Sequence, residues 1–343
     1  MKVGSGESEV TKNELFFRQV KISEAPPFQV AGFGSILQIE KSVELRNPPR
    51  NQALSFYLPN GELRRVVNRS TLATFDTLIQ MAIESLGNQR RALSFAQDYS
   101  IIIVNDALFP QLSPSPQRPS WAGAYVTNDG FVIYHQDYLT AAFGQINPEK
   151  TFTFGGETFF IDLFLRELIH EMDHSREVKL LFDNDANLCE WFYSHSLWWF
   201  EGQREFIAGI ELSPITDQEF ARKLTQHLVN GNISCTQFSN SFWELDQSPT
   251  ARNFGYQYSA RWVRKLVERL LKLQTEKNIA GSWEKDNAID FMEMITYEMI
   301  QAHKNGTFSG DILQFLSTYF DTTIDEILGW EREWQASITH HKI

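Results

Sequence analysis

Cysteines and long apolar runs are scarce in this chain. Its 343 residues include two cysteines, Cys189 and Cys235, which form no C-x-x-C motif, so a disulfide framework is not expected. No segment approaches the roughly 18 uninterrupted apolar residues that a membrane span requires. The polar start MKVGSGESEV also lacks the apolar region of a secretory signal. We therefore expect a cytoplasmic protein with no membrane span.

Basic residues are outnumbered by acidic ones. The chain has 31 Lys and Arg against 43 Asp and Glu, which gives a formal net charge of −12. Nucleic-acid binding depends on clustered Lys and Arg that contact phosphates, so nucleic acid is not an expected partner. The 42% of hydrophobic and 13% of aromatic residues are typical of a globular protein with a buried core.

The N-terminal part of the chain has a strand-like pattern. Residues 1–12 resemble a loose tail, and residues 38–45 partly alternate between polar and apolar side chains. A short apolar segment at 54–58 is followed by the Pro-Asn-Gly turn signal at 59–61. Residues 1–69 are therefore predicted to form a tail and a small β-rich region.

A helix and further strands are expected next. Residues 71–86 predict a helix, and the short β-branched segment 100–104 predicts a buried strand. The segments 124–126 and 131–134 flank an Asn-Asp-Gly sequence at 128–130, which is typical of a β-hairpin.

Beyond residue 158 the apolar pattern becomes helical. The expected helices cover residues 159–181, 188–210, 217–229, 259–275, 288–304, 310–320 and 323–336. The sequence therefore predicts an α+β fold. Its three parts are the β-rich region 1–69, a part at 70–215 that carries the main motif, and a helical part at 216–343.

The main motif is His170-Glu171-Met172-Asp173-His174, an H-E-x-x-H placed inside a helical apolar pattern. Two histidines four residues apart lie on one face of an α-helix. Two imidazoles on one face can bind one zinc ion, and Glu171 can then handle the proton of the attacking water. The motif predicts a zinc hydrolase and favours a peptidase.

A catalytic zinc ion needs a third protein ligand. The metzincin extension requires Gly three residues and His six residues after His174, but Glu177 and Leu180 stand there, which excludes that class. Asp183 and Asp185 are candidate ligands, although their segment has the composition of a polar loop between helices.

Glu201 is the third candidate ligand. It follows Trp198, Trp199 and Phe200 on the next expected helix, where a buried carboxylate is costly unless a cation accompanies it. A zinc ion supplies that cation. The aromatic run at 191–193 together with 198–200 is otherwise interpreted as core.

These residues resemble a known pattern. The sequence from His170 to His174, followed by Trp198-x-x-Glu201-Gly202-x-x-x-Phe206, is similar to the gluzincin pattern HExxH plus W-x-x-E-G-x-A-x-Y of MA-clan metallopeptidases, which include the M1 aminopeptidases and the peptidase MA-like group. The resemblance implies a thermolysin-like catalytic domain with a mixed sheet and zinc-binding helices. Arg204 and Phe206 depart from the pattern beside the site.

The resemblance extends to a tyrosine. Tyr256-Gln257-Tyr258-Ser259-Ala260 is similar to the Y-E-K-G-A helix start of the M1 enzymes, in which the tyrosine donates a hydrogen bond to the oxyanion. Tyr256 matches that position, and Tyr258 is a rival for the same role. The end of the chain also resembles the last helices of MA-like peptidases, so the likeness covers roughly residues 70–340.

One part of the M1 pattern is missing. Those enzymes hold the free amine of the substrate with the glutamate of a G-x-M-E-N strand, and the corresponding segment here, 123–128, has no carboxylate at that place. This weakens the expectation of an exopeptidase. Tyr125 and Val126 on that strand are still expected to bind an extended peptide by strand addition.

The resulting hypothesis assigns a role to each residue. His170, His174 and Glu201 bind one Zn²⁺, Glu171 is the general base, and Tyr256 stabilises the oxyanion. Glu205, one turn after Glu201, is expected to hold a metal-bound histidine from behind. The partner is then a peptide or protein substrate. Two alternatives stay open: a zinc hydrolase acting on a non-peptide bond, and an inactive gluzincin scaffold that serves as a binding module.

Overall fold

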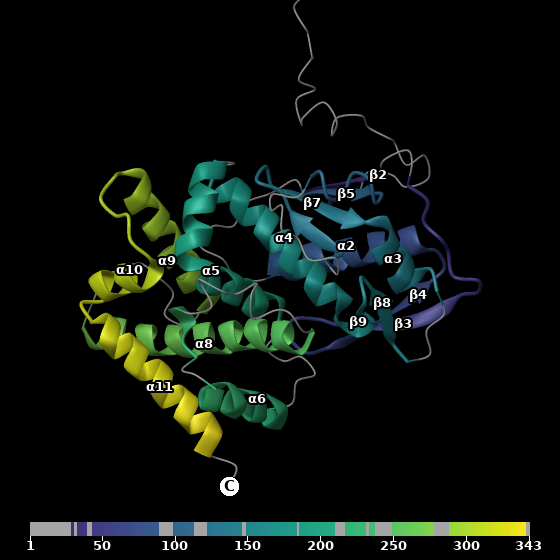
Figure 1. The fold of residues 1–343 in the computed structure, drawn as a ribbon. Helices are drawn as coiled ribbons and strands as arrows, with labels where there is room; N and C mark the ends of the chain where they lie inside the picture. Colours follow the sequence, from purple (N-terminus) through teal and green to yellow (C-terminus); the bar gives the residue numbers. More distant parts are fainter. Residues whose placement is uncertain are drawn as a thin grey trace, which may run out of the picture.

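The computed structural model is a mixed α+β protein, as predicted (Figure 1). It describes residues 29–30, 33–39, 43–88, 99–112, 122–145, 149–183, 185–209, 217–230, 233–236, 249–277 and 288–340. The predicted tail at 1–12 lies outside these residues. Within them, no helix has both the length and the apolar character needed to cross a membrane.

The largest sheet is mixed. Its order is β1 (Gln29–Val30), β2 (Phe33–Ile39), β5 (Tyr99–Val104), β7 (Phe131–His135) and β6 (Ala124–Val126). β2, β5 and β7 are parallel, whereas β6 pairs antiparallel with β7. The predicted buried strand and hairpin are thus confirmed. β2 comes from the predicted N-terminal region and pairs with β5 of the following part.

Three helices and two small hairpins complete the sheet side of the molecule. The helices are α2 (Thr71–Asn88), α3 (Gln136–Phe143) and α4 (Phe164–Leu180), and the hairpins are β3 (Gln52–Tyr57) with β4 (Leu63–Asn68) and β8 (Thr151–Phe154) with β9 (Glu157–Phe160). Side chains of all three helices and of the sheet share one buried core.

The predicted start of a helix at residue 159 is wrong. Phe159 and Phe160 belong to β9, and their partners on β8 are Phe152 and Thr151. Gly155 and Gly156, with φ of 58° and 85°, form the turn of this hairpin, a conformation that glycine adopts at little cost. The apolar rhythm of the following helix continues back into the strand and conceals the boundary.

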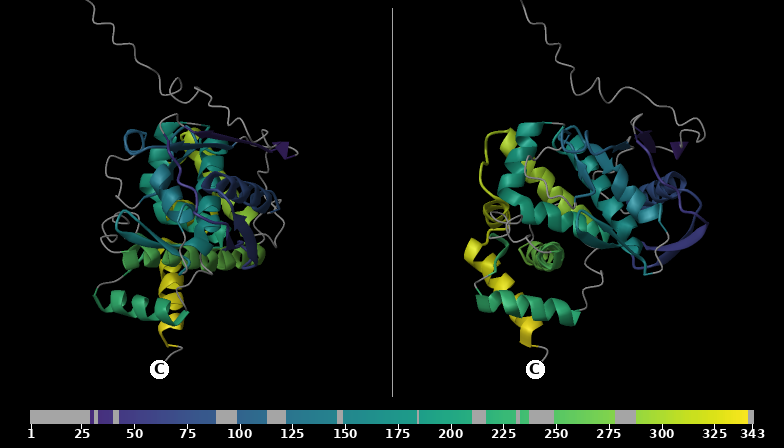
Figure 2. Two further views of the ribbon diagram at one scale, coloured as in Figure 1. Left: turned by 90° about the vertical axis from the view of Figure 1, so that its right-hand side faces the viewer. Right: turned by 45° about the vertical axis from the view of Figure 1, so that its right-hand side comes forward.

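The rest of the described chain is helical. It comprises α5 (Ala186–Ala208), α6 (Asp217–Asn230), α8 (Pro249–Glu276), α9 (Ala288–Lys304), α10 (Ile312–Tyr319) and α11 (Ile324–His340). Six helices were predicted here and are confirmed, although α8 begins at Pro249 instead of residue 259. These helices share a second core. Figure 2 shows α6 and α11 at the end of the molecule away from the sheet.

Helix α4 joins the two cores. Residues from Phe164 to Met172 pack in the core of the sheet, whereas Val178 packs in the core of the helices. Helix α5 does the reverse, because Trp198 and its neighbours lie in the helical core while Ile207 lies in the sheet core. The H-E-x-x-H segment is therefore held at the junction, where neighbours on both sides fix its position.

Candidate metal centre

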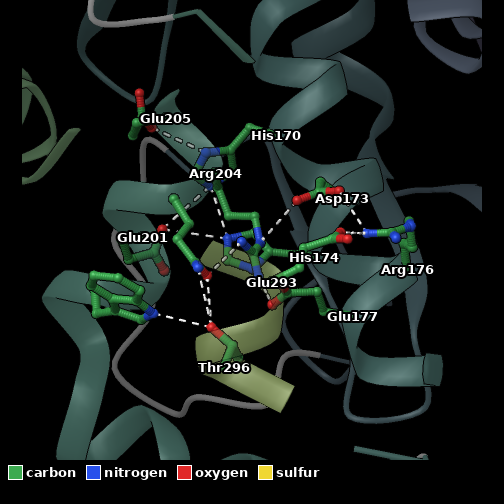
Figure 3. A network of polar contacts seen from close by, with 12 residues as sticks. His170, Asp173, His174, Arg176, Glu177, Glu201, Arg204, Glu205, Glu293 and Thr296 are labelled. Atoms are coloured by element: carbon green, nitrogen blue, oxygen red, sulfur yellow. Dashed lines mark hydrogen bonds and ion pairs between the residues drawn. The ribbon is translucent and has the colours of Figure 1, made fainter. Parts of the chain in front are cut away.

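The two histidines of the motif lie one turn apart on α4, and their Nε2 atoms point toward each other. His170 is 7% exposed and His174 is 4% exposed. Their Nε2 atoms are 2.9 Å apart, and the rings cross at 73°. The helix thus presents two imidazole nitrogens at one point beneath the surface (Figure 3).

Glu201 on α5 brings a carboxylate to the same point. Its Oε2 atom lies 3.3 Å from the Nε2 atom of His170 and 3.3 Å from that of His174. The other two candidate ligands are used differently. Asp185 caps α5 by accepting hydrogen bonds from its first backbone N–H groups, and Asp183 occupies a turn with φ of 53°.

The three atoms fit a metal ion. Zinc–nitrogen distances of about 2.0–2.1 Å in a tetrahedral site place neighbouring ligand atoms about 3.3 Å apart, close to the separations between Glu201 and the two imidazoles. Oε2 of Glu201 is buried, and among the described residues it makes no hydrogen bond of good geometry, although two ring nitrogens lie 3.3 Å away. A buried acceptor without a partner is costly, and a cation at the centre of the group removes that cost. His170, His174 and Glu201 can therefore hold a metal ion.

The second ring nitrogen of each histidine also faces a polar group. Nδ1 of His170 lies 3.1 Å from Oε1 of the buried Glu205. Nδ1 of His174 lies 3.4 Å from the hydroxyl of Tyr193. Metal-binding histidines commonly donate this second N–H to an oxygen, which fixes the ring and leaves Nε2 free for the ion. The structure thus places Glu205 where the sequence predicted it.

The charges of the group depend on one another. Burial by itself lowers the pKa of both imidazoles; that of His174 stays lowered, whereas contacts with Glu201 and Glu205 raise the pKa of His170 well above 6.5. Burial also acts to raise the pKa of the Glu201 carboxyl, but His174 and His170 outweigh it and hold that pKa far below its ordinary value. The arrangement favours a positive charge at its centre, which a proton or a metal ion can supply.

Glu171 is positioned beside this group and is half-buried, whereas the other residues of the motif are buried. Burial raises the pKa of Tyr134 on β7 and of Tyr193 on α5, and the charge of Glu171 raises both further. Glu171 is thus the most exposed residue of the motif.

The structure distinguishes the two rival tyrosines of α8. The half-buried ring of Tyr256 stands edge-on to His170, with 6.1 Å between the ring centroids. Tyr258 is fully buried; its hydroxyl donates to Glu331 over 2.7 Å and accepts from Gln335 over 2.7 Å. Tyr256 is therefore the tyrosine near the metal-holding group.

A glycine explains how α8 comes so close. A Cβ atom added at Gly202 would lie 2.6 Å from the Val263 side chain and 2.8 Å from the carbonyl oxygen of Ser259. The two helices therefore touch at a position where no larger side chain fits. Gly202 directly follows Glu201, so the contact that brings α8 close to α5 lies beside the carboxylate of the metal-holding group.

The predicted substrate-binding residues lie on β6, against which α4 packs. The side chain of Tyr125 is buried, and its hydroxyl donates to the carbonyl oxygen of Phe109 over 2.6 Å. Val126 is half-buried and packs against both cores. β6 is the last strand in the order of the main sheet, and the Tyr125 ring is held inside the protein.

A second group of possible ligands, Asp106, His135 and Asp137, lies where the neighbouring strands β5 and β7 end. Nδ1 of His135 accepts a hydrogen bond from the backbone N–H of Asp137 over 3.0 Å, and Nε2 pairs with Asp106. A neutral ring whose Nδ1 accepts a hydrogen bond carries its proton on Nε2, so neither nitrogen has a free lone pair. This group caps α3 and is not suited to hold a metal ion.

Two residues near the centre were not assigned a role from the sequence. Tyr193 belongs to the aromatic run that was interpreted as core, but its hydroxyl lies 3.4 Å from Nδ1 of His174, on a helix that is kinked at Ser196 with φ of −147° and ψ of 22°. Arg204 was noted as a departure beside the site, and the structure buries it completely against α4. A kink and a buried ion pair are not encoded in local periodicity.

Comparisons with protein-family models, with curated proteins and with solved structures find no match for this chain. A function for it is therefore argued from the residues of the centre and from their geometry.

Proposed function

We propose that this protein is a zinc-dependent peptidase of the gluzincin type with a thermolysin-like catalytic part. The observation that carries the proposal is the convergence of three buried ligand atoms from His170, His174 and Glu201 beside the half-buried Glu171. Two histidines and one glutamate form a donor set used by catalytic zinc sites, which leaves one position open for water or substrate.

When bound, zinc supplies a Lewis acid that acidifies water and polarises a carbonyl group. Glu171 accepts the proton of the attacking water and returns it to the leaving amine. Tyr256 donates a hydrogen bond to the oxygen that becomes negative in the transition state. Glu205 keeps the His170 ring oriented through its contact with Nδ1.

The proposed substrate is an extended peptide. β6 is the last strand in the order of the main sheet, and α4 packs against it, so a peptide that adds to this strand passes close to the motif. The strand segment carries no carboxylate to bind a free amine. This favours cleavage within a chain over removal of its first residue.

The decisive experiment compares Glu171→Gln with the wild-type protein. Both are expected to contain one zinc ion per chain, and only the wild type is expected to cleave a mixed peptide library, because Gln cannot accept the proton. Glu190→Gln, at an exposed position of α5, is the matched control and keeps full activity. A wild-type protein that binds zinc and cleaves no peptide would refute the peptidase proposal.

A further inference from the structure

Arg204 is a buried guanidinium that ties α5 to α4. Its side chain is 0% exposed, its Nε atom lies 3.2 Å from Oδ2 of Asp173, and its Nη2 atom contacts the Glu177 carboxylate (Figure 3). Both carboxylates belong to the helix that carries the two histidines. Arg204 follows Glu201 by three residues on α5, so one helical turn carries both the third ligand and this ion pair.

Arg204 also reaches the metal-holding group through an aromatic ring. Its guanidinium carbon lies 4.5 Å from the centre of the Phe200 ring. The Phe200 ring in turn packs on His174, with 4.8 Å between the centroids. Arg204 thus reaches His174 indirectly, through the Phe200 ring. It reaches α4 directly, through its ion pairs with Asp173 and Glu177.

The surrounding contacts extend to a third helix. Oε1 of Gln203 accepts a hydrogen bond from Nη1 of Arg204 over 3.2 Å, and its Nε2 donates to Thr296 on α9 over 3.1 Å. A neighbouring pair, Arg176 with Glu293, joins α4 to α9. Nη1 of Arg176 also lies 3.7 Å from Oδ1 of Asp173, so Asp173 links this second pair to the Arg204 group.

Stability alone does not account for the Arg204 contacts. Removing charges from water is costly, and replacing a buried ion group with well-packed apolar residues often leaves a protein equally stable or more stable. Directional contacts of this kind can instead fix one geometry. Such a constraint is needed here, because Oε2 of Glu201 must stay 3.3 Å from two nitrogens on another helix while α5 is kinked at Ser196.

We propose that Arg204 is a positioning residue of the metal centre. Its ion pairs with Asp173 and Glu177 set the register of α5 on α4 and thereby hold Glu201 against both histidines. The inference rests on the proposed metal site, but it concerns metal affinity and geometry and does not depend on which bond the enzyme cleaves.

The test replaces the whole ion group at once. The triple variant Asp173→Asn, Glu177→Gln, Arg204→Met removes the three charges together, leaves Arg176 paired with Glu293 and keeps side chains of similar volume. It is expected to fold with a thermal midpoint near that of the wild type and to bind zinc about 10- to 100-fold more weakly in a chelator competition, the range expected when support behind metal ligands is lost. Co²⁺ in place of zinc is expected to show an altered visible spectrum, because the ligand geometry changes.

Two further variants sharpen the test. Arg204→Lys keeps the charge but not the two-pronged contact, and its zinc affinity is expected to lie between those of the wild type and the triple variant. The double variant Arg269→Gln, Glu333→Gln removes an exposed ion pair between α8 and α11 and is the control. Its zinc affinity and Co²⁺ spectrum are expected to stay at the wild-type values.

The outcomes separate this inference from the proposed function. A wild-type chain that binds no zinc overturns both. If the wild type binds zinc and the triple variant binds it equally tightly with an unchanged Co²⁺ spectrum, the inference alone is overturned. An unfolded triple variant overturns it as well, because the charges would then be needed for the fold and not specifically for the site.

Discussion

The hydroxyl of Tyr193 lies 3.4 Å from Nδ1 of His174, and the two rings are nearly parallel, with an interplanar angle of 26°. The ring of the same tyrosine also packs edge-on against the Phe200 ring, with 4.5 Å between the ring centroids. It therefore holds His174 in the way that Glu205 holds His170, with a neutral oxygen in place of a carboxylate. Each metal-facing imidazole thus has its own oxygen behind it.

Removing that hydroxyl is expected to weaken metal binding. Tyr193→Phe keeps the ring stack but leaves Nδ1 of His174 without its oxygen, so zinc affinity should fall about tenfold while the free energy of unfolding changes by only about 1 kcal/mol. Chelator competition and urea denaturation measure the two quantities. Tyr297→Phe, on α9, is the control. Unchanged zinc affinity in Tyr193→Phe would show that the 3.4 Å contact is incidental.

The identity of the third ligand can be tested with two carboxylates of α5. Glu201→Ala should bind zinc at least about 100-fold more weakly than the wild type, because an oxygen that binds the ion directly is removed. Asp185→Ala should keep zinc and lose about 1 kcal/mol of stability, because Asp185 caps the helix. Metal analysis after dialysis, with thermal unfolding alongside, distinguishes them. The reverse result would assign the third ligand to Asp185.

The two tyrosines of α8 should differ in what their loss affects. Tyr256→Phe is expected to lower kcat about 100-fold with zinc content unchanged, since only the transition state loses a hydrogen bond. Tyr258→Phe should instead destabilise the fold by about 1–3 kcal/mol, because it leaves the buried Glu331 and Gln335 short of a partner. Steady-state kinetics on folded protein, combined with denaturation curves, decides the matter. Equal kcat losses in both variants would contradict the assignment.

Gly202 tests how closely α5 and α8 must approach. Gly202→Ala places a methyl group 2.8 Å from a backbone oxygen. We expect this overpacking to lower the free energy of unfolding by about 1–3 kcal/mol. We also expect a lower kcat, because α8 and Tyr256 shift. The control is Gly329→Ala on α11, where the nearest atom would be 3.8 Å away. Gly329→Ala should leave the free energy of unfolding unchanged or raise it by about 0.5–1 kcal/mol. Equal effects of the two substitutions would argue against the close contact.

Glu331 should make stability depend on pH. Burial raises the pKa of its carboxyl above 4.5, so the folded protein holds this proton more tightly than the unfolded chain does. That contribution is fully present below pH 4.5 and is lost as the pH rises through the higher folded pKa. The free energy of unfolding of Glu331→Gln should therefore improve relative to the wild type as the pH rises above about 4.5. Urea denaturation across this range measures it.

The control for that experiment is Glu333→Gln, an exposed position on the same helix. It removes the same charge from the chain without entering the buried contacts with Tyr258 and Cys235. If Glu331→Gln instead becomes less stable relative to the wild type as the pH rises, the folded protein favours the charged carboxylate of Glu331 over its protonated form.

Much of the secondary structure follows from local pattern. The strand at β5 and the hairpin of β6 and β7 were predicted because β-branched runs and an Asn-Asp-Gly turn act within a few residues. Helix α3 was not predicted, because it is short and begins at His135, whose ring accepts the capping hydrogen bond from Asp137. Histidine is not among the usual capping residues, so the sequence contains no ordinary start signal there.

The sequence by itself determined that His170 and His174 share one face of a helix with Glu171 beside them, because a helical repeat alone fixes those directions. It also named Glu201 and Tyr256 as candidates, with rivals for each. Tertiary structure places Glu201 and Tyr256 near the two histidines. The packing of α5 on α4 and the contact at Gly202 bring residues that are distant in sequence together. Tyr193, three residues before the kink at Ser196, lies beside His174 in the same way. These relations depend on how whole helices fit against one another, which no local pattern specifies.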